Sequence, residues 1–198
     1  PRSTLFPYTT LFRSRLGVPD IVVANAGISM GTLSEHAEDL DAIRRVMDTN
    51  FFGMAATFSP FIGNMRRAGG GRLVGVASVA GIRGLPGSEA YSASKAAVIT
   101  YLESLRVELR PSGIKVVTLC PGYIRTAMTA ANPFPMPFLM SADAAAARFA
   151  RAIDRGRSYV VVPWQMGIVA RVLRLLPNAV YDRLMVGAPR KPRQASGE

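Results

Sequence analysis

Short apolar runs alternate with longer helical patterns along this sequence, and that alternation limits the fold more than any other feature. Runs that suit buried strands lie at residues 20–24, 73–77, 115–119 and 159–162. Patterns with helical spacing lie at residues 38–67, 91–109, 142–155 and 165–176. Strands that are apolar on both faces are typical of parallel sheets covered by helices. The order of the elements therefore predicts an α/β fold with a parallel sheet and flanking helices.

Three polar side chains follow the second of these strands. Ser78 comes directly after the run 73–77, and ligands bind at the carboxyl edge of an open α/β sheet. Tyr91 and Lys95 begin the next helical pattern four residues apart, so their side chains share one helix face. A nearby ammonium lowers a phenol pKa that is otherwise about 10. This trio predicts an acid or base at Tyr91, with Ser78 holding the reacting oxygen.

Plainer interpretations exist for these residues. An isolated Tyr-x-x-x-Lys pair is more often a half-buried ring beside a lysine that reaches solvent. A serine hydrolase is a poorer alternative, because residues 76–80 lack the glycines of a nucleophile elbow. His36 is the single histidine of the chain, so a Ser-His-Asp triad would depend on it. A metal site built from several histidines is impossible, and we predict none.

A wider set of motifs resembles the short-chain dehydrogenase/reductase family over about residues 15 to 165. In order, these motifs are Asn25-Ala26-Gly27 after a strand, Asn50 in Thr-Asn-Phe-Phe-Gly, Ser78, Tyr91 with Lys95, and Pro121-Gly122 with Thr126 after another strand. The resemblance implies a partial doubly wound, Rossmann-type parallel sheet in one compact domain. Its strands would correspond to the family's fourth to seventh.

The resemblance also implies an activity and a set of roles. Hydride would pass between a nicotinamide cofactor, NAD or NADP, and a carbonyl or alcohol. The implied catalytic residues are Asn50, Ser78, Tyr91 and Lys95. The implied cofactor-binding residues are Asn25, Ala26, Gly27, Asn50, Tyr91, Lys95, Pro121, Gly122, Ile124 and Thr126. Family members pair the helices that carry Asn50 and Tyr91 with copies in a second subunit, so a homodimer or homotetramer is expected.

The glycine-rich turn that receives the cofactor pyrophosphate in that family has no counterpart in this sequence. Gly69-Gly70-Gly71 precedes a strand, and Gly81, Gly84 and Gly87 open no helix at the right place. We therefore expect a truncated domain with impaired cofactor binding and an exposed apolar edge at strand 20–24. The residue that separates NAD from NADP belongs to the same part of the family fold. The alternative is a non-catalytic remnant that acts as a dimerising or membrane-surface module.

The two ends of the chain differ from its middle. Residues 3–14 look like the translation of a sequencing-adapter oligonucleotide, so we expect a non-native leader at 1–14. The domain is expected to span residues 15–189, followed by a basic, disordered tail at 190–198. The net charge of +11 suggests nucleic-acid binding as an alternative function. The arginines are scattered along helices without interleaved aromatic residues, which argues against that function. The single cysteine, Cys120, excludes an internal disulfide and suits the cytoplasm.

Two apolar segments in the second half of the chain have open interpretations. Residues 127–140 form a proline-rich loop where the family has its substrate lid. Their aromatic and methionine side chains favour an apolar substrate, or equally packing of the lid on the core. Residues 165–198 combine amphipathic helical patterns with a basic tail, so they cover the pocket, form a subunit contact or lie on a membrane surface. No apolar run reaches the ~20 residues that span a bilayer.

Overall fold

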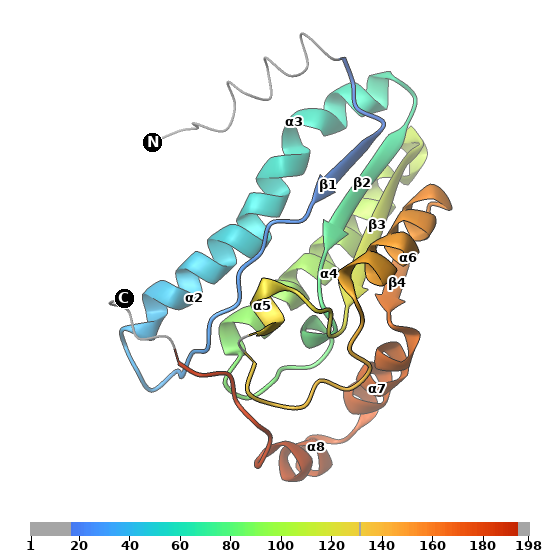
Figure 1. Ribbon diagram of the computed structural model, residues 1–198. Coiled ribbons are helices and arrows are strands. Elements are labelled where there is room, and N and C mark those ends of the chain that lie inside the picture. Colours follow the sequence, from blue (N-terminus) through green and yellow to red (C-terminus); the bar gives the residue numbers. More distant parts are fainter. Residues whose placement is uncertain (1–16, 131, 194–198) are drawn as a thin grey trace.

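The computed structural model describes residues 17–130 and 132–193 (Figure 1). Its strands are β1 (Ile21–Ala24), β2 (Gly71–Val76), β3 (Ile114–Pro121) and β4 (Tyr159–Val162). Its helices are α2 (Asp39–Met47), α3 (Gly53–Arg67), α4 (Glu89–Leu109), α5 (Ala127–Ala130), α6 (Ala142–Asp154), α7 (Trp164–Leu175) and α8 (Asn178–Met185). The predicted leader at 1–14 and the last five residues of the predicted tail lie outside the described residues.

The four strands form one parallel sheet in the order β1-β2-β3-β4. Helices α2 and α3, α4, and α6 form the three successive crossovers between them, as parallel neighbours require. Each predicted strand is present within a few residues of its expected bounds. The prediction of an α/β fold with a partial Rossmann-type sheet is therefore confirmed.

Helices cover both faces of the sheet (Figure 1). Helices α3 and α4 pack on one face, where Phe58 and Leu102 are fully buried against Leu73 and Val116. Helix α6 covers part of the other face, where Phe149 and Ile153 pack on Val74, Val117 and Leu119. Successive residues of a strand point to opposite faces, so each central strand contributes to both layers. This explains why its sequence is almost continuously apolar.

Strand β1 is the edge of the sheet among the described residues, and it pairs with β2. Val22 and Ala24 point into the core under α3, whereas Ile21 and Val23 are 37% and 48% exposed. Among residues 17–130 and 132–193, the edge strand β1 therefore exposes apolar side chains on one face of the sheet. A row of unpaired backbone groups beside apolar side chains is a template for further strand pairing.

The predicted single helix at 38–67 is interrupted. A π-helical turn at Asp48–Phe52 separates α2 from α3 and contains Asn50, whose amide bonds to a loop instead of facing solvent. Leu40, whose spacing from Ile43 and Met47 would place it on one apolar face of an unbroken helix, is 63% exposed. The extra residue of a π turn shifts the helical phase, so no single apolar stripe runs through the whole segment.

The apolar face predicted for 165–176 is divided in the structure. Helix α7 buries Met166, Gly167 and Ala170, whereas a second stripe faces outward. Its members are Trp164, Ile168, Val172 and Leu175. Both stripes have helical spacing, and the sequence period alone cannot tell which of them meets the core. Across residues 17–130 and 132–193, every helix is too short or too polar to span a lipid bilayer.

The basic tail predicted as disordered from residue 190 is ordered in its first part. Lys191 donates a hydrogen bond to the Ser29 carbonyl, and the Arg193 guanidinium bonds both oxygens of Asp39. These residues end a segment at 187–193, the C-terminal strap, which runs from α8 to the start of α2 (Figure 1). The Arg-, Lys- and Pro-rich composition of this tail is typical of disordered segments. The Asp39 carboxylate gives Arg193 a charged partner, and this hydrogen bond orders the segment.

Gly81 permits the close contact between the turn after Ser78 and helix α4. A Cβ atom at Gly81 would lie 2.6 Å from the Lys95 carbonyl carbon, which is rigid backbone. We expect Gly81→Ala to lower the free energy of unfolding by about 1–3 kcal/mol, the usual cost of overpacking. Urea denaturation measures this change. Gly84→Ala is the matched control, because a Cβ there meets nothing within 4 Å; an equal loss in both variants would contradict the steric argument.

Candidate active site

Ser78 lies at the carboxyl end of β2, as predicted. Its extended backbone begins a short turn at Val79–Gly81, and its hydroxyl oxygen accepts a hydrogen bond of 3.2 Å from the Ala80 amide. This cap fixes the direction of the Ser78 side chain. The residue is 7% exposed and opens into a cavity.

Tyr91 and Lys95 lie in the first turns of α4 and share one face of that helix. The Lys95 nitrogen lies 5.8 Å from the centre of the Tyr91 ring. It donates a hydrogen bond of 2.8 Å to the Val76 carbonyl, and Lys95 is 3% exposed. Because Val76 is the last residue of β2, this bond fastens the start of α4 to the strand that carries Ser78. The snorkelling lysine of the plainer interpretation is therefore ruled out by its burial.

The pKa of Tyr91 differs from the predicted lowering. Burial raises the pKa of the phenol, and a hydrogen bond with the Ser78 side chain offsets this in part. The ammonium of Lys95 is turned toward the Val76 carbonyl, which explains why its charge does not lower the pKa of the Tyr91 phenol. Burial also lowers the pKa of Lys95 to about 8, so the lysine is mainly cationic at pH 7.

Asn50 connects the π turn to both the loop after β1 and helix α4. Its side-chain oxygen accepts from the Ile28 amide at 2.8 Å, and its nitrogen donates to the Ile28 carbonyl at 2.9 Å and to the Ser94 hydroxyl at 2.9 Å. Gly27 lies beside it, and a Cβ atom there would be 3.3 Å from both the Asn50 oxygen and the Lys95 nitrogen. Three sequence motifs therefore meet at one buried polar cluster.

A cavity of about 120 Å³ adjoins these groups at the carboxyl edge of the sheet. Ser78 and Tyr91 are on its wall, and the wall is otherwise formed by the loops after β1, β2 and β3 and by one residue of the C-terminal strap. The remaining lining residues are Ser29, Val79, Ala80, Leu85, Ser88, Gly122, Tyr123, Met128, Thr129, Asn132, Phe134 and Lys191. Met128 and Phe134 come from the segment predicted as a substrate lid.

Several predicted cofactor residues lie outside this cavity. Asn25 and Ala26 are exposed at the end of β1. Ile124 forms a bridge to Met140 and accepts a hydrogen bond from the Thr129 hydroxyl. The Thr126 side chain is exposed and lies 3.4 Å from the Thr129 hydroxyl. Pro121 ends β3 beside Gly122.

Sequence reasoning missed three residues of the site. Ser94 bonds Asn50 and the Tyr91 carbonyl, and its position three residues after the tyrosine was a usable signal. Ser29 and Lys191 both line the cavity and bond each other, although 162 residues separate them. Nothing in the local sequence of either residue indicates that contact.

Cys120 lies beneath the site and is fully buried in β3. Burial raises the pKa of its thiol to about 11, so it stays neutral near pH 7. A buried, neutral thiol in such surroundings is unreactive. Among the described residues, no cluster of three or more His, Cys, Asp or Glu side chains could hold a metal ion.

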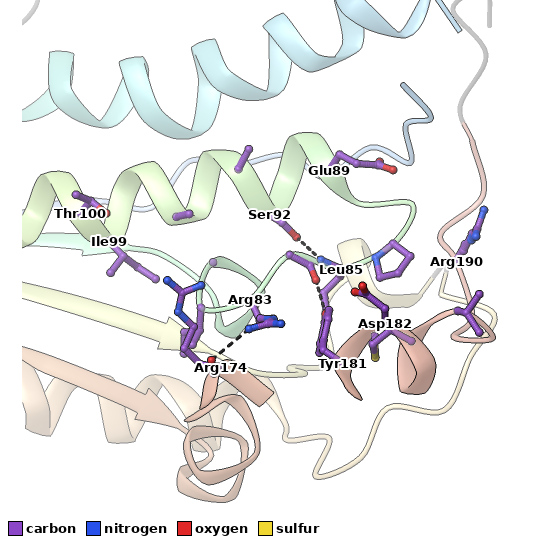
Figure 2. Close-up of a pocket in the computed structure, with 18 of the residues that line it drawn as sticks. Arg83, Leu85, Glu89, Ser92, Ile99, Thr100, Arg174, Tyr181, Asp182 and Arg190 are labelled. Carbon is purple, nitrogen blue, oxygen red and sulfur yellow. Dashed lines mark hydrogen bonds between the residues drawn. The ribbon is translucent and has the colours of Figure 1, made fainter. Parts of the chain in front are cut away.

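A second, larger cavity of about 900 Å³ lies between α4 and α8 (Figure 2). Leu85 lines both cavities, so the loop at 82–87 is the wall between them. Figure 2 shows Tyr181 of α8 pointing at this loop, where its hydroxyl donates to the Gly84 carbonyl. The Arg83 guanidinium lies 4.2 Å from the centre of the Tyr181 ring. Helix α8 therefore braces the loop that separates the cavities.

The residues around Gly27 and Lys95 fit the ribose and nicotinamide end of a dinucleotide. An ammonium has three donors, and the structure pairs one of those of Lys95. Gly27 leaves space beside that ammonium which a side chain would fill. Gly122, in the loop after β3, and Tyr91, in α4, both line the cavity of about 120 Å³. These groups offer hydrogen-bond donors to hydroxyls next to the Tyr91 phenol.

Comparison with known proteins agrees with this geometry. A family model described as short chain dehydrogenase matches residues 8–134. A protein of Myxococcus xanthus named as an oxidoreductase is 45% identical over 163 residues, which cover 82% of this chain and 64% of the relative. The cis-4-hydroxycyclohexanecarboxylate dehydrogenase of Sinomonas cyclohexanicum is 36% identical over 138 residues, 70% of this chain and 55% of that protein. The chain thus spans less than two thirds of the length of both relatives.

A solved structure supports the same assignment. The short chain dehydrogenase of Burkholderia cenocepacia, crystallised with NADP, has a TM-score of 0.75 and 28% identity, over 90% of this chain and 74% of its own. The matched family model covers most of the sheet, Ser78, Tyr91 and Lys95. On these grounds, the chain belongs to the short-chain dehydrogenase family.

Proposed function

We propose that this site interconverts an alcohol and a carbonyl with NAD or NADP as the redox partner. The observation that carries the proposal is the joint position of Ser78 and Tyr91 on one cavity, with a buried ammonium behind the tyrosine. A nicotinamide would supply or accept the hydride. The NADP in the Burkholderia neighbour supports this class of cofactor.

The residues of the site have distinct roles in this proposal. The Ser78 hydroxyl, fixed by its cap, orients the substrate oxygen. Tyr91 gives a proton to that oxygen on reduction or takes it on oxidation. Lys95 keeps positive charge near the phenol and holds ribose hydroxyls with its unpaired donors. Asn50 fixes the loop of Gly27 against α4 and completes the proton path.

The raised pKa of Tyr91 keeps the phenol protonated near neutral pH, which is the form that gives a proton to a carbonyl oxygen during reduction. The apolar part of the cavity wall, with Leu85, Met128 and Phe134, supports an apolar substrate. The substrate in the name of the Sinomonas relative carries an alcohol and a carboxylate on a cyclohexane ring, and its ring agrees with that lining.

Replacement of Tyr91 by phenylalanine tests the proton-transfer role. In a version of the chain extended by the glycine-rich cofactor half of the family fold, we expect Tyr91→Phe to lower kcat/KM for reduction of a hydrophobic ketone by about 10²–10⁴-fold, since it removes the general acid. The affinity for NADPH, measured by calorimetric titration, should stay within about twofold. Tyr101→Phe on the same helix is the control, because that ring packs against Phe51 away from the cavity. Retained turnover in Tyr91→Phe would remove the tyrosine from the mechanism.

A homodimer through α3 and α4 is part of the proposal. Phe52 and Val107 are 58% and 61% exposed on the segments that family members pair between subunits. We expect light scattering to report a dimer, and Phe52→Glu to shift it to the monomer by placing a charge in an apolar contact. Leu175→Glu on α7 should leave the dimer intact. A monomeric wild-type chain would refute this part.

The alternative function, a membrane-surface module, is favoured by α7 and α8. Their outward residues include Trp164, Ile168, Val172 and Leu175, with exposed Arg171, Arg174 and Arg183 beside them. Apolar side chains between arginines suit an anionic bilayer. Such a contact does not require catalysis, and it is compatible with the enzyme.

Vesicle binding tests that surface. We expect the chain to co-sediment with vesicles that contain phosphatidylserine and to bind much less to neutral phosphatidylcholine vesicles. The double variant Ile168→Glu and Leu175→Glu should reduce binding by tenfold or more, because both apolar side chains face outward. Phe52→Glu is the control. Equal binding of the double variant and the wild type would exclude α7 as the membrane surface.

A further inference from the structure

The C-terminal strap, residues 187–193, is fixed at its end by a buried carboxylate. Asp39 is 1% exposed, and its oxygens each accept from the Arg193 guanidinium at 3.0 Å. The Leu33 amide donates to the same carboxylate at 2.8 Å. The hydrogen bond with Arg193 lowers the pKa of Asp39 below its usual value. Both contacts come from the Nε–H of Arg193, which the two oxygens share, while its Nη2 nitrogen lies 3.4 Å from the Glu38 carboxylate. These charged contacts fix the position of Arg193 at the end of the strap.

Close backbone packing holds the strap along its length. A Cβ atom at Gly31 would come within 2.2 Å of the Pro192 carbonyl oxygen, so the two backbones are in direct contact. Earlier in the strap, the Arg190 side chain packs on Gly87 of the loop between the two cavities. Figure 2 shows Arg190 beside that loop. The strap therefore crosses the opening between the loops after β1 and β2.

Lys191 projects from this strap onto the wall of the cavity that contains Ser78 and Tyr91. Its ammonium donates to the Ser29 carbonyl at 3.1 Å. Within residues 17–130 and 132–193, no carboxylate forms an ion pair with it. Partial burial lowers its pKa, because the ammonium loses contact with water.

The charge of the Lys191 ammonium contrasts with the apolar side chains that line much of the same cavity. The wall facing the catalytic pair is built largely from apolar groups, among them Leu85, Met128 and Phe134. A substrate that fits both features has an apolar body and an anionic group at one end. An ammonium has two further donors after its bond to Ser29, enough for a carboxylate.

We propose that Lys191 binds the carboxylate of an apolar hydroxy or keto acid whose reacting oxygen lies at Ser78 and Tyr91. This inference rests on the proposed function and narrows its substrate class. The strap thus sets specificity, because it places one positive charge on the wall of the cavity that also contains Ser78 and Tyr91. Charged hydrogen bonds in a partly dry site contribute strongly to selection between charged and neutral analogues.

Binding measurements on the chain itself test this subsite without turnover. The probes are cyclohexanecarboxylate and its neutral analogue cyclohexanecarboxamide, titrated by calorimetry or ligand-observed NMR. We expect the wild type to bind the carboxylate at least tenfold more tightly than the carboxamide. Lys191→Met should abolish that preference and leave carboxamide binding within about twofold. Lys115→Met, an exposed lysine at the opposite end of β3, should change neither.

The other outcomes are informative. No saturable carboxylate binding by the wild type, or an unchanged preference in Lys191→Met, would overturn the proposal. Equal loss of both probes would assign Lys191 a structural role in the strap, which also overturns it. A cofactor phosphate presents the same anionic oxygens, so NADP is titrated in parallel; loss of NADP affinity in Lys191→Met would assign the lysine to the cofactor instead. Because no turnover is measured, failure here is distinguishable from failure of Tyr91 as the acid.

Discussion

The contact between helix α4 and strand β2 is the constraint on which the site depends. Gly75 and Gly81 permit this contact, because a Cβ at either position would collide with Leu102 or with the backbone at Lys95. The Lys95 ammonium then reaches the Val76 carbonyl across the junction. A buried ammonium without a hydrogen-bond partner would raise the free energy of the folded protein. The bond to Val76 therefore favours one position of the helix relative to the strand. Ser78 and Tyr91 face one cavity as a consequence of that position.

A second interaction, around Asn50, extends this order to the loop after β1. The π turn directs the Asn50 amide into the protein, where three hydrogen bonds satisfy it. A regular helix would point the same residue elsewhere, and Ile28 would lose partners for both its amide and its carbonyl. The loop of Gly27 is thereby positioned against Lys95. Local irregularity in a helix is typical of functional positions of this kind.

The C-terminal part of the chain has an inner side that packs on the protein and an outer side that exposes apolar residues to solvent. Its inner side, through Tyr181 and the strap, braces the loops that border the catalytic cavity. Its outer side exposes apolar residues of α7 between arginines. Some positively charged side chains are therefore not solvated surface groups: Arg193 and Lys191 form specific hydrogen bonds within the fold. The net charge of the sequence does not distinguish solvent-exposed cations from those that are hydrogen-bonded within the fold.

The sequence by itself determined the fold class, the parallel sheet and the residues that meet at Ser78. Buried strands and helix periods are local patterns, and the spacing of Tyr91 and Lys95 fixes their shared face because a helix has a constant pitch. Only the tertiary structure decided the phase of the segment around Asn50, the outward stripe of α7, the raised pKa of Tyr91 and the place of Lys191. Each of these depends on groups distant in sequence: the Ile28 backbone, the sheet under α7, the burial of the phenol, and the Asp39 carboxylate that captures Arg193. Local periodicity contains no information about such partners, so the sequence pattern left them open.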